Sequence, residues 1–155
     1  MNTAFYYQNP NAPGPNRPNH LGVVVLLRFR GKVLLEHRTD SEVWAFIGGA
    51  LELDETLKAG AVREVKEETG ISLQEDDLVL FGLYDDPSRI IAYPDGNVLR
   101  SVSVAYETEL HTEPVLVCSE ESRELRFFGP DELWKVMIAA THIPILQDVL
   151  KGKGV

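Results

Sequence analysis

The feature that most constrains the fold of this chain is the acidic stretch of residues 48–71, GGALELDETLKAGAVREVKEETGI. It holds six carboxylates between Glu52 and Glu68, and it ends in a glycine that is typical of a helix stop. The pattern predicts a helix over residues 54–70 with an acidic first turn. At ~100° per residue, Glu64, Glu67 and Glu68 share one arc of roughly 100°. Beside it lies an apolar arc suited to packing on a sheet, formed by Ala61, Val62, Val65 and Thr69.

The like charges on this helix need compensation. Two carboxylates ~6 Å apart repel by ~3 kcal/mol at an effective dielectric of about 20, in a domain whose stability is only ~5–15 kcal/mol. Arg63 and Lys66 offset part of this repulsion. Clustered carboxylate oxygens also suit hard cations such as Mg²⁺ or Mn²⁺. The spacing alone leaves two interpretations open, a metal site and a solvated acidic helix face.

Strand patterns surround the predicted helix. Residues 21–38, LGVVVLLRFRGKVLLEHR, indicate a hairpin joined at Gly31–Lys32. Alternation of Val102, Val104 and Tyr106 with Ser101, Ser103 and Ala105 indicates a strand with one buried face. The order of elements predicts a mixed α/β sandwich and not regular βαβ winding. Strands are predicted at residues 78–85, 89–93, 98–110, 113–118 and 123–128, and further helices at 129–140 and 143–152.

Composition restricts location and partners. The 155 residues predict an irregular arm over residues 1–20, rich in proline, and a single domain over residues 21–155. No signal peptide or membrane-spanning run is recognised, so we expect a cytoplasmic protein. Cys118 is the sole cysteine, which excludes an internal disulfide, and we expect it to be buried. A net charge of −9 argues against long nucleic acid as a partner.

The acidic segment resembles the signature of the Nudix hydrolase family. That signature is Gly, five residues, Glu, seven residues, then Arg-Glu-aliphatic-any-Glu-Glu-any-Gly-aliphatic. It is complete here, although the proline that often precedes the glycine pair is replaced by Ile47. The resemblance implies a Nudix-type α/β/α sandwich with a catalytic loop and helix. The matching residues are Gly49, Glu55, Arg63, Glu64, Val65, Glu67, Glu68, Gly70 and Ile71.

The resemblance also implies roles for individual residues. Glu64, Glu67 and Glu68 are expected to be metal ligands or water-activating groups, and the carbonyl of Gly48 is expected to be a further ligand. The expected metal is Mg²⁺, with Mn²⁺ as a substitute. Arg63 is expected to steady the glutamates by ion pairing. The general base is either Glu64 or a glutamate of a distal loop, where Glu120, Glu121 and Glu124 are candidates and Glu121 is preferred. Arg38, Trp44 and Phe46 are candidate substrate contacts, with a core role open for the two aromatic residues.

The implied activity is cleavage of the diphosphate linkage in a small nucleoside diphosphate derivative. ADP-ribose or a nucleotide sugar is placed slightly ahead of nucleoside triphosphates, because Pro87 stands sixteen residues beyond Ile71 (87 − 71), as in many ADP-ribose-cleaving members. The alternative is a Nudix module that senses a nucleotide without cleaving it. An isoprenoid diphosphate isomerase is disfavoured, since Cys118 is the sole candidate for its cysteine. Family members often pair, so a homodimer to which the aromatic arm contributes is a further expectation.

Overall fold

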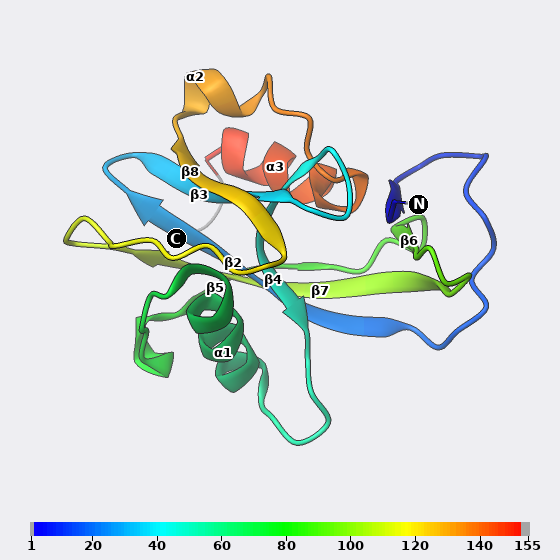
Figure 1. The fold of residues 1–155 in the computed structure, drawn as a ribbon, viewed down its shortest axis with the longest axis horizontal. Coiled ribbons are helices and arrows are strands. Elements are labelled where there is room, and N and C mark those ends of the chain that lie inside the picture. The colour runs from blue at the N-terminus through cyan, green and yellow to red at the C-terminus, as the bar shows by residue number, and fades with distance from the viewer. Residues whose placement is uncertain (1, 153–155) are drawn as a thin grey trace.

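The computed structural model describes residues 2–152, which form one curled mixed sheet with helices on both faces (Figure 1). In this part of the chain the order of the sheet is β1-β6-β7-β2-β4-β3-β8, and β5 also pairs with β7. Strands β2 and β7 run parallel over a nine-residue register from His20↔Ser101 to Arg28↔Glu109. The strands are β1 (Ala4–Tyr6), β2 (His20–Phe29), β3 (Lys32–Arg38), β4 (Trp44–Ala50), β5 (Val79–Tyr84), β6 (Ile90–Ala92), β7 (Val98–Glu109) and β8 (Ser122–Phe128).

The predicted hairpin is present, with its turn one residue earlier than expected. Strands β2 and β3 pair from Phe29↔Lys32, so Arg30 and Gly31 form the two-residue loop. Both have positive φ, 50° and 76°, which is the conformation of a type I′ turn. Glycine adopts it without strain, and the turn fixes the register of the two strands.

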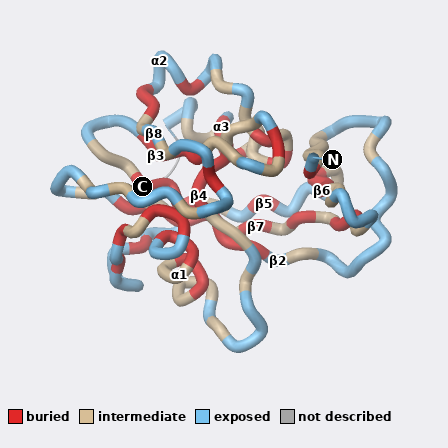
Figure 2. Tube along the Cα trace, in the orientation of Figure 1, coloured by how far each residue is buried: buried red, intermediate tan, exposed pale blue. Residues whose placement is uncertain are grey.

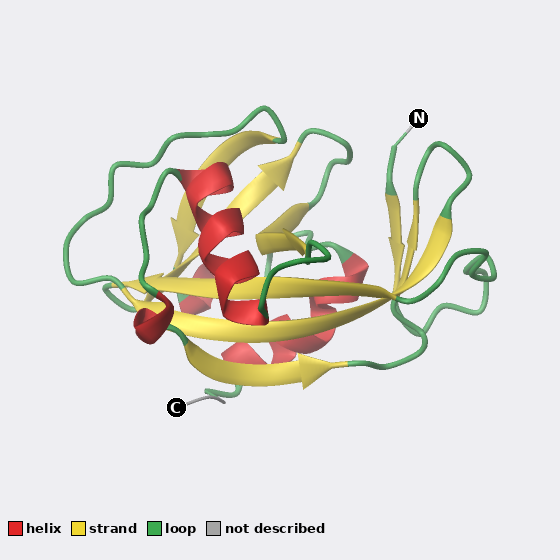
Figure 3. Cartoon of the chain, turned by 90° about the horizontal axis from the view of Figure 1, so that it is seen from below, coloured by secondary structure: helices red, strands yellow, loops and turns green. Residues whose placement is uncertain are grey.

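Helices cover the two faces of the sheet, so the predicted α/β/α sandwich is confirmed (Figure 3). Helix α1 (Leu57–Thr69) lies on one face, and α2 (Pro130–Leu133) and α3 (Ile143–Leu150) lie on the other. Short 3₁₀ turns, η1 (Glu75–Asp77) and η2 (Ala140–His142), complete the described helical elements. Within residues 2–152, each helix is too short or too polar to traverse a bilayer.

Alternating residues of β2 pack into two separate hydrophobic cores, one on each face of the sheet. Val23, Val25 and Leu27 pack with Ala61 and Val65 of α1. Val24 and Leu26 pack on the opposite face with Phe46, Ile145 and Leu146. Figure 2 shows the resulting buried stretches along the centre of the sheet and the inner side of α1. A strand that is buried on both faces has apolar residues at consecutive positions, which explains the sequence GVVVLL at residues 22–27.

Several expected elements differ from the structure. Helix α1 begins at Leu57, after the N-cap Thr56, so Asp54 and Glu55 lie in the preceding loop and not in a first turn. Residues 113–118 form no strand; Val115 and Val117 are exposed, and so is Cys118, whose predicted burial is wrong. In β7 the serines at 101 and 103 are buried, whereas Val102 and Val104 are only partly covered.

Two terminal predictions also need correction. The helix expected over residues 129–140 ends at Leu133, because the main chain of Trp44 bonds to Met137 and Ala139 and draws that segment alongside β4. The arm over residues 1–20 is not wholly irregular, since β1 pairs antiparallel with β6 from Ala4↔Ala92 to Tyr6↔Ile90. The N-terminal segment thereby becomes a structured edge of the sheet.

Candidate active site

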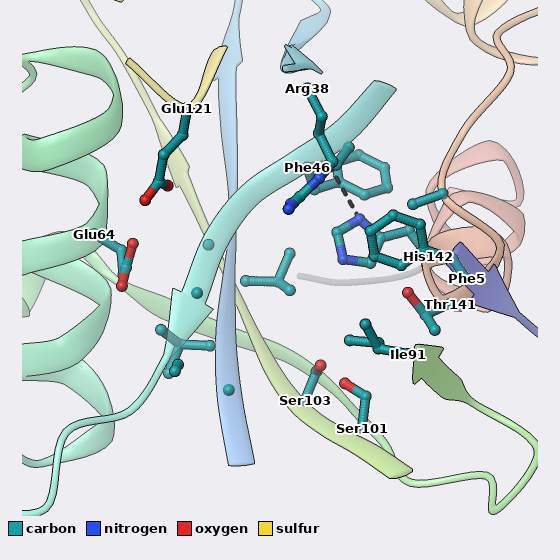
Figure 4. A pocket seen from close by; sticks show the side chains of 18 of the residues that line it. Phe5, Arg38, Phe46, Glu64, Ile91, Ser101, Ser103, Glu121, Thr141 and His142 are labelled. Atoms are coloured by element: carbon teal, nitrogen blue, oxygen red, sulfur yellow. Dashed lines mark hydrogen bonds between the residues drawn. The ribbon is translucent and has the colours of Figure 1, made fainter. Parts of the chain in front are cut away.

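A cavity of about 450 Å³ opens between α1, the glycine end of β4 and the segments beside η2 (Figure 4). Its two walls differ in chemistry. One wall carries the carboxylates of Glu64, Glu67, Glu68 and Glu121. The other is aromatic and mostly uncharged, and includes Phe5, Phe46, Ile91, Tyr93, Ser101, Ser103, Thr141 and His142.

Glycines at the end of β4 allow the carboxylate wall to form. A Cβ at Gly48 would lie 2.1 Å from the carbonyl oxygen of Val23 on the paired strand. A Cβ at Gly49 would lie 2.5 Å from Oε1 of Glu64. At Gly48 the contact is with strand backbone, so no side chain fits there, whereas at Gly49 the missing side chain lets α1 bring the Glu64 carboxylate against the strand.

Arg63 is the centre of an ion-pair network on the outer side of α1. Its Nη2 lies 2.6 Å from Glu55 Oε1, and its Nη1 lies 2.9 Å from Glu64 Oε1 and 3.2 Å from Glu67 Oε2. It also donates to the carbonyl of Ala50 at 3.0 Å. The guanidinium therefore ties the loop before the helix to the carboxylate wall. Hydrogen bonds from Arg63 and from the amide of Glu52 lower the pKa of Glu55 to about 2.

Glu68 is the most deeply buried carboxylate of this wall, with 3% of its surface exposed. Burial, together with repulsion from Glu36 and Glu64, raises its pKa to about 10. The amide of Gly48 donates to its Oε2 at 3.1 Å and opposes part of that shift. Burial likewise raises the pKa of Glu36 to about 7, against a hydrogen bond from Ser122. Holding these carboxylates ionised together is therefore costly.

The donors of this wall fit a hard divalent cation. Among residues 2–152, no three acidic, histidine or cysteine side chains already converge as a ready metal site. Glu64, Glu67, Glu68 and Gly48 nevertheless line the same cavity, and their oxygens are the ligand type that Mg²⁺ and Mn²⁺ prefer. A cation would offset the cost of burial and the mutual repulsion that raise the pKa of Glu64 and Glu68.

The distal glutamates take different positions. Glu121 lines the cavity on the same side as Glu64 of α1 (Figure 4). Its carbonyl accepts hydrogen bonds from the amide and the hydroxyl of Thr39, both at 3.0 Å, which tether the loop to the end of β3. Glu124 lies on β8 and contacts Arg126 at 3.5 Å. The geometry thus favours Glu121 over Glu124 as a group near the reaction.

The three candidate substrate contacts also occupy different environments. Arg38 lines the cavity, where its Nε and Nη2 each donate to Asp40 at 2.7 Å, and its guanidinium lies over the ring of Phe5. Phe46 also borders the cavity, but only 1% of its surface is exposed and its side chain packs in the core with Val24, Leu26 and Ile145. Trp44 lies elsewhere: it stacks on His37 at 4.9 Å and packs edge-on against Phe128. Trp44 is partly buried and packs against the same core as Phe46, so the structure favours the core role for both aromatic residues.

The structure adds functional candidates that the sequence patterns did not single out. His142 Nδ1 accepts a hydrogen bond from the amide of Phe46 at 3.1 Å. Arg89, with 1% of its surface exposed, donates to the carbonyls of Thr141, Tyr84 and Ser101 and to the hydroxyl of Ser103. A histidine without ligand spacing and an arginine in a turn carry no local signal. The sequence offered one related signal, the serines at 101 and 103 that alternate with valines in a predicted strand.

Comparisons with known proteins agree with this architecture. The model of the NUDIX domain matches residues 17–149. A MutT-like protein of Streptomyces ambofaciens is 35% identical over 153 residues, covering 95% of this chain and 85% of that protein. An ADP-ribose pyrophosphatase of Methanocaldococcus jannaschii is 30% identical, covering 79% and 68%. A CTP pyrophosphohydrolase of Escherichia coli K12 is 26% identical, covering 81% and 87%.

Solved structures show the same fold. The MutT protein of Methanosarcina mazei Go1 superposes with a TM-score of 0.71 at 20% identity, covering 90% of this chain and 98% of that one. A bifunctional NMN adenylyltransferase/ADP ribose pyrophosphatase of Francisella tularensis, complexed with AMP and a Mn ion, gives 0.68 at 22% identity, covering 91% of this chain and 44% of that longer one. The complete signature, the sandwich and these matches lead to one conclusion. This chain belongs to the Nudix family and is a hydrolase of phosphoanhydride bonds, in a family that generally uses divalent metals.

Proposed function

We propose that the protein is a Mg²⁺-dependent pyrophosphohydrolase that cleaves the diphosphate linkage of a small nucleoside diphosphate derivative. ADP-ribose or a nucleotide sugar is placed ahead of nucleoside triphosphates. The observation that carries the proposal is the two-sided cavity, in which a carboxylate wall faces an aromatic, neutral wall. A nucleotide has the same division, with charged phosphates at one end and a planar base at the other.

The residues at the carboxylate wall take distinct roles in this proposal. Glu64, Glu67, Glu68 and the carbonyl of Gly48 would hold the cation. When bound, a divalent cation neutralises phosphate charge and lowers the pKa of water. Arg63 keeps Glu64 and Glu67 in place through its ion pairs at 2.9 and 3.2 Å. The phosphates would lie between this wall and Arg38, whose charge complements theirs.

Water supplies the atoms that the reaction needs. Its oxygen attacks one phosphorus of the linkage, the phosphoanhydride bond breaks, and the bridging oxygen leaves on the other phosphate. ADP-ribose would give AMP and ribose 5-phosphate. Either Glu64 or Glu121 accepts the proton of the attacking water, since both line the cavity.

The preference for ADP-ribose has two supports of unequal weight. The Methanocaldococcus jannaschii relative, described as an ADP-ribose pyrophosphatase, is 30% identical, whereas the relative described as a CTP pyrophosphohydrolase is 26% identical. Pro87 adds less, because it is exposed in the turn between β5 and β6 and its neighbour Asp86 bonds to Ser88. Its position is accounted for by turn geometry, which favours proline.

The test is phosphate release, coupled to a phosphatase where the products are monoesters, with Mg²⁺, Mn²⁺ or EDTA. The panel contains ADP-ribose, nucleotide sugars, ordinary and oxidised nucleoside triphosphates, and dinucleoside polyphosphates. We expect metal-dependent turnover that is highest for ADP-ribose or a nucleotide sugar. Higher turnover of a triphosphate would correct the substrate class. No turnover with any member, together with tight nucleotide binding, would replace the proposal with a sensing module.

A further inference from the structure

The neutral wall of the cavity holds one hydrogen-bond donor in a fixed direction. The ring of His142 points into the cavity, and its Nδ1 accepts from the amide of Phe46 at 3.1 Å (Figure 4). Burial, with the nearby charges of Arg89 and Arg38, lowers the pKa of His142 to about 3. A neutral imidazole that accepts at Nδ1 carries its proton on Nε2. That N–H is therefore available to a ligand.

The surrounding structure keeps this donor in place. Arg89 Nε donates to the carbonyl of Thr141 at 2.8 Å, which fixes the residue next to His142. The ring of Phe46 lies 5.8 Å from that of His142. Arg89 reaches β7 through the carbonyl of Ser101 and the hydroxyl of Ser103. Strands β4 and β7 and the turn η2 are thus locked together behind the donor, and a preorganised donor loses little freedom on binding.

The neighbouring surfaces suit a planar group. Phe5 and Tyr93 line the cavity together with His142 and are partly exposed, and the carboxylate wall lies on the other side. Flat apolar side chains stack on heteroaromatic rings, while the edge of such a ring needs a polar partner. A nucleobase has ring nitrogens or oxo groups at its edge that accept hydrogen bonds.

We propose that the base of the substrate nucleotide lies at the neutral wall of the cavity, and that the Nε2–H of His142 donates to an acceptor atom on its edge. His142 is then a specificity-determining residue. This inference rests on the proposed function for the identity of the ligand as a nucleotide. It goes further by assigning the base end of the cavity and the atom that recognises it.

Two substitutions separate recognition from packing. In His142→Asn, the amide oxygen can still accept from the amide of Phe46, but no N–H reaches the position of Nε2. In His142→Gln, the longer side chain restores an N–H near that position. His37→Phe is the matched control, because His37 stacks on Trp44 outside the cavity and phenylalanine keeps the stacking. Thermal unfolding confirms that each variant is folded.

The probes are the α,β-methylene analogue of ADP-ribose and its counterpart with hydrogen in place of adenine. Their dissociation constants are measured by calorimetry with Mg²⁺. We expect His142→Asn to weaken binding of the adenine-bearing probe about tenfold, the value of one hydrogen bond, and to leave the other probe unchanged. His142→Gln should recover most of the affinity, and His37→Phe should match the wild type.

Two outcomes would overturn the inference. Equal weakening of both probes would show a structural role or a contact with the sugar, and unchanged affinity of the adenine-bearing probe would show no contact. These readouts do not require turnover. A wild-type protein that hydrolyses nothing in the substrate panel would refute the proposed function. The comparison of the two probes would still test whether His142 contacts the base.

Discussion

At the scale of single residues, the unfavourable energy of the carboxylate wall is concentrated in Glu68. It is almost fully buried, its pKa is raised to about 10 by burial first, and the amide of Gly48 donates a hydrogen bond to it. A carboxylate in that position stays protonated unless a positive charge compensates it. The residue thus costs stability in the metal-free protein, and the proposed role of Glu68 in holding a cation would account for its position.

We predict that Glu68→Gln lowers kcat at least about a hundredfold, the scale on which one charge-stabilising group acts, and leaves the fold intact. In EDTA, between pH 4.5 and about 10, folded wild type keeps a proton on Glu68 that the unfolded chain releases. The unfolding free energy of wild type therefore falls as pH rises through this range. The variant lacks this group, so its stability relative to wild type should grow with pH. Urea titrations at several pH values measure the difference, and full activity in the variant would contradict the assigned role.

A second residue-scale prediction concerns Gly49. A Cβ there would stand 2.5 Å from the carboxylate of Glu64, the movable end of a side chain. We expect Gly49→Ala to displace that carboxylate and lower kcat by about tenfold to a hundredfold, since small misplacements are costly in catalysis. The melting temperature should change little. Gly14→Ala is the control, because its Cβ would meet nothing within 4 Å. Unchanged kcat would show that the placement of Glu64 is not used.

At the scale of elements, α1 is defined by its two ends. Thr56 accepts a hydrogen bond from the amide of Ala59 at 3.1 Å and caps the N-terminus. Gly70, with φ of 80°, closes the C-terminus through a bond from its amide to the carbonyl of Lys66. The predicted C-terminus is correct, because Gly70 is a local signal. The predicted start is too early, because Asp54 and Glu55 resemble a first helical turn, whereas Glu55 is held in the loop by Arg63.

We predict that Thr56→Ala lowers the unfolding free energy by about 1 kcal/mol, the usual value of an N-cap side chain. The lost bond leaves an amide of the first turn without its protein acceptor. Thr56→Ser retains a hydroxyl and should stay within about 0.5 kcal/mol of wild type. Urea denaturation of the three proteins gives the comparison. An equal loss in both variants would point to the methyl group of Thr56 instead of its hydroxyl.

At the scale of the whole molecule, Arg89 joins parts of the chain that are distant in sequence. It is almost fully buried and donates to main-chain carbonyls at residues 84, 101 and 141. These belong to β5, β7 and η2, which together support the neutral wall of the cavity. Burial lowers the pKa of Arg89 to about 10, so it remains charged at neutral pH.

We predict that Arg89→Ala lowers the unfolding free energy by at least about 3 kcal/mol, because each buried carbonyl left without a donor costs ~1–3 kcal/mol. The loss is a large part of a total of ~5–15 kcal/mol. Arg17→Ala is the control, since Arg17 is exposed and its guanidinium bonds to the carbonyl of Asn16. Guanidinium denaturation measures both variants. A loss below 1 kcal/mol for Arg89→Ala would show that water replaces its bonds.

The sequence by itself determined the parts that depend on local spacing. The carboxylates of α1 are three and four residues apart, so any helix there places them together. The hairpin turn, the glycine stop and the apolar run of β2 are likewise local signals, and they were enough to predict the sandwich and the carboxylate wall.

Only the tertiary structure decided the opposite wall and the terminal segments. Four elements, β4, β6, β7 and η2, supply Phe46, Ile91, Ser101, Ser103 and His142, and they meet because β2 pairs parallel with β7 and η2 packs behind β4. Residues 134–139 leave the helical conformation because hydrogen bonds to Trp44 replace those of a helix. Such contacts form between residues dozens of positions apart, and local periodicity carries no information about them.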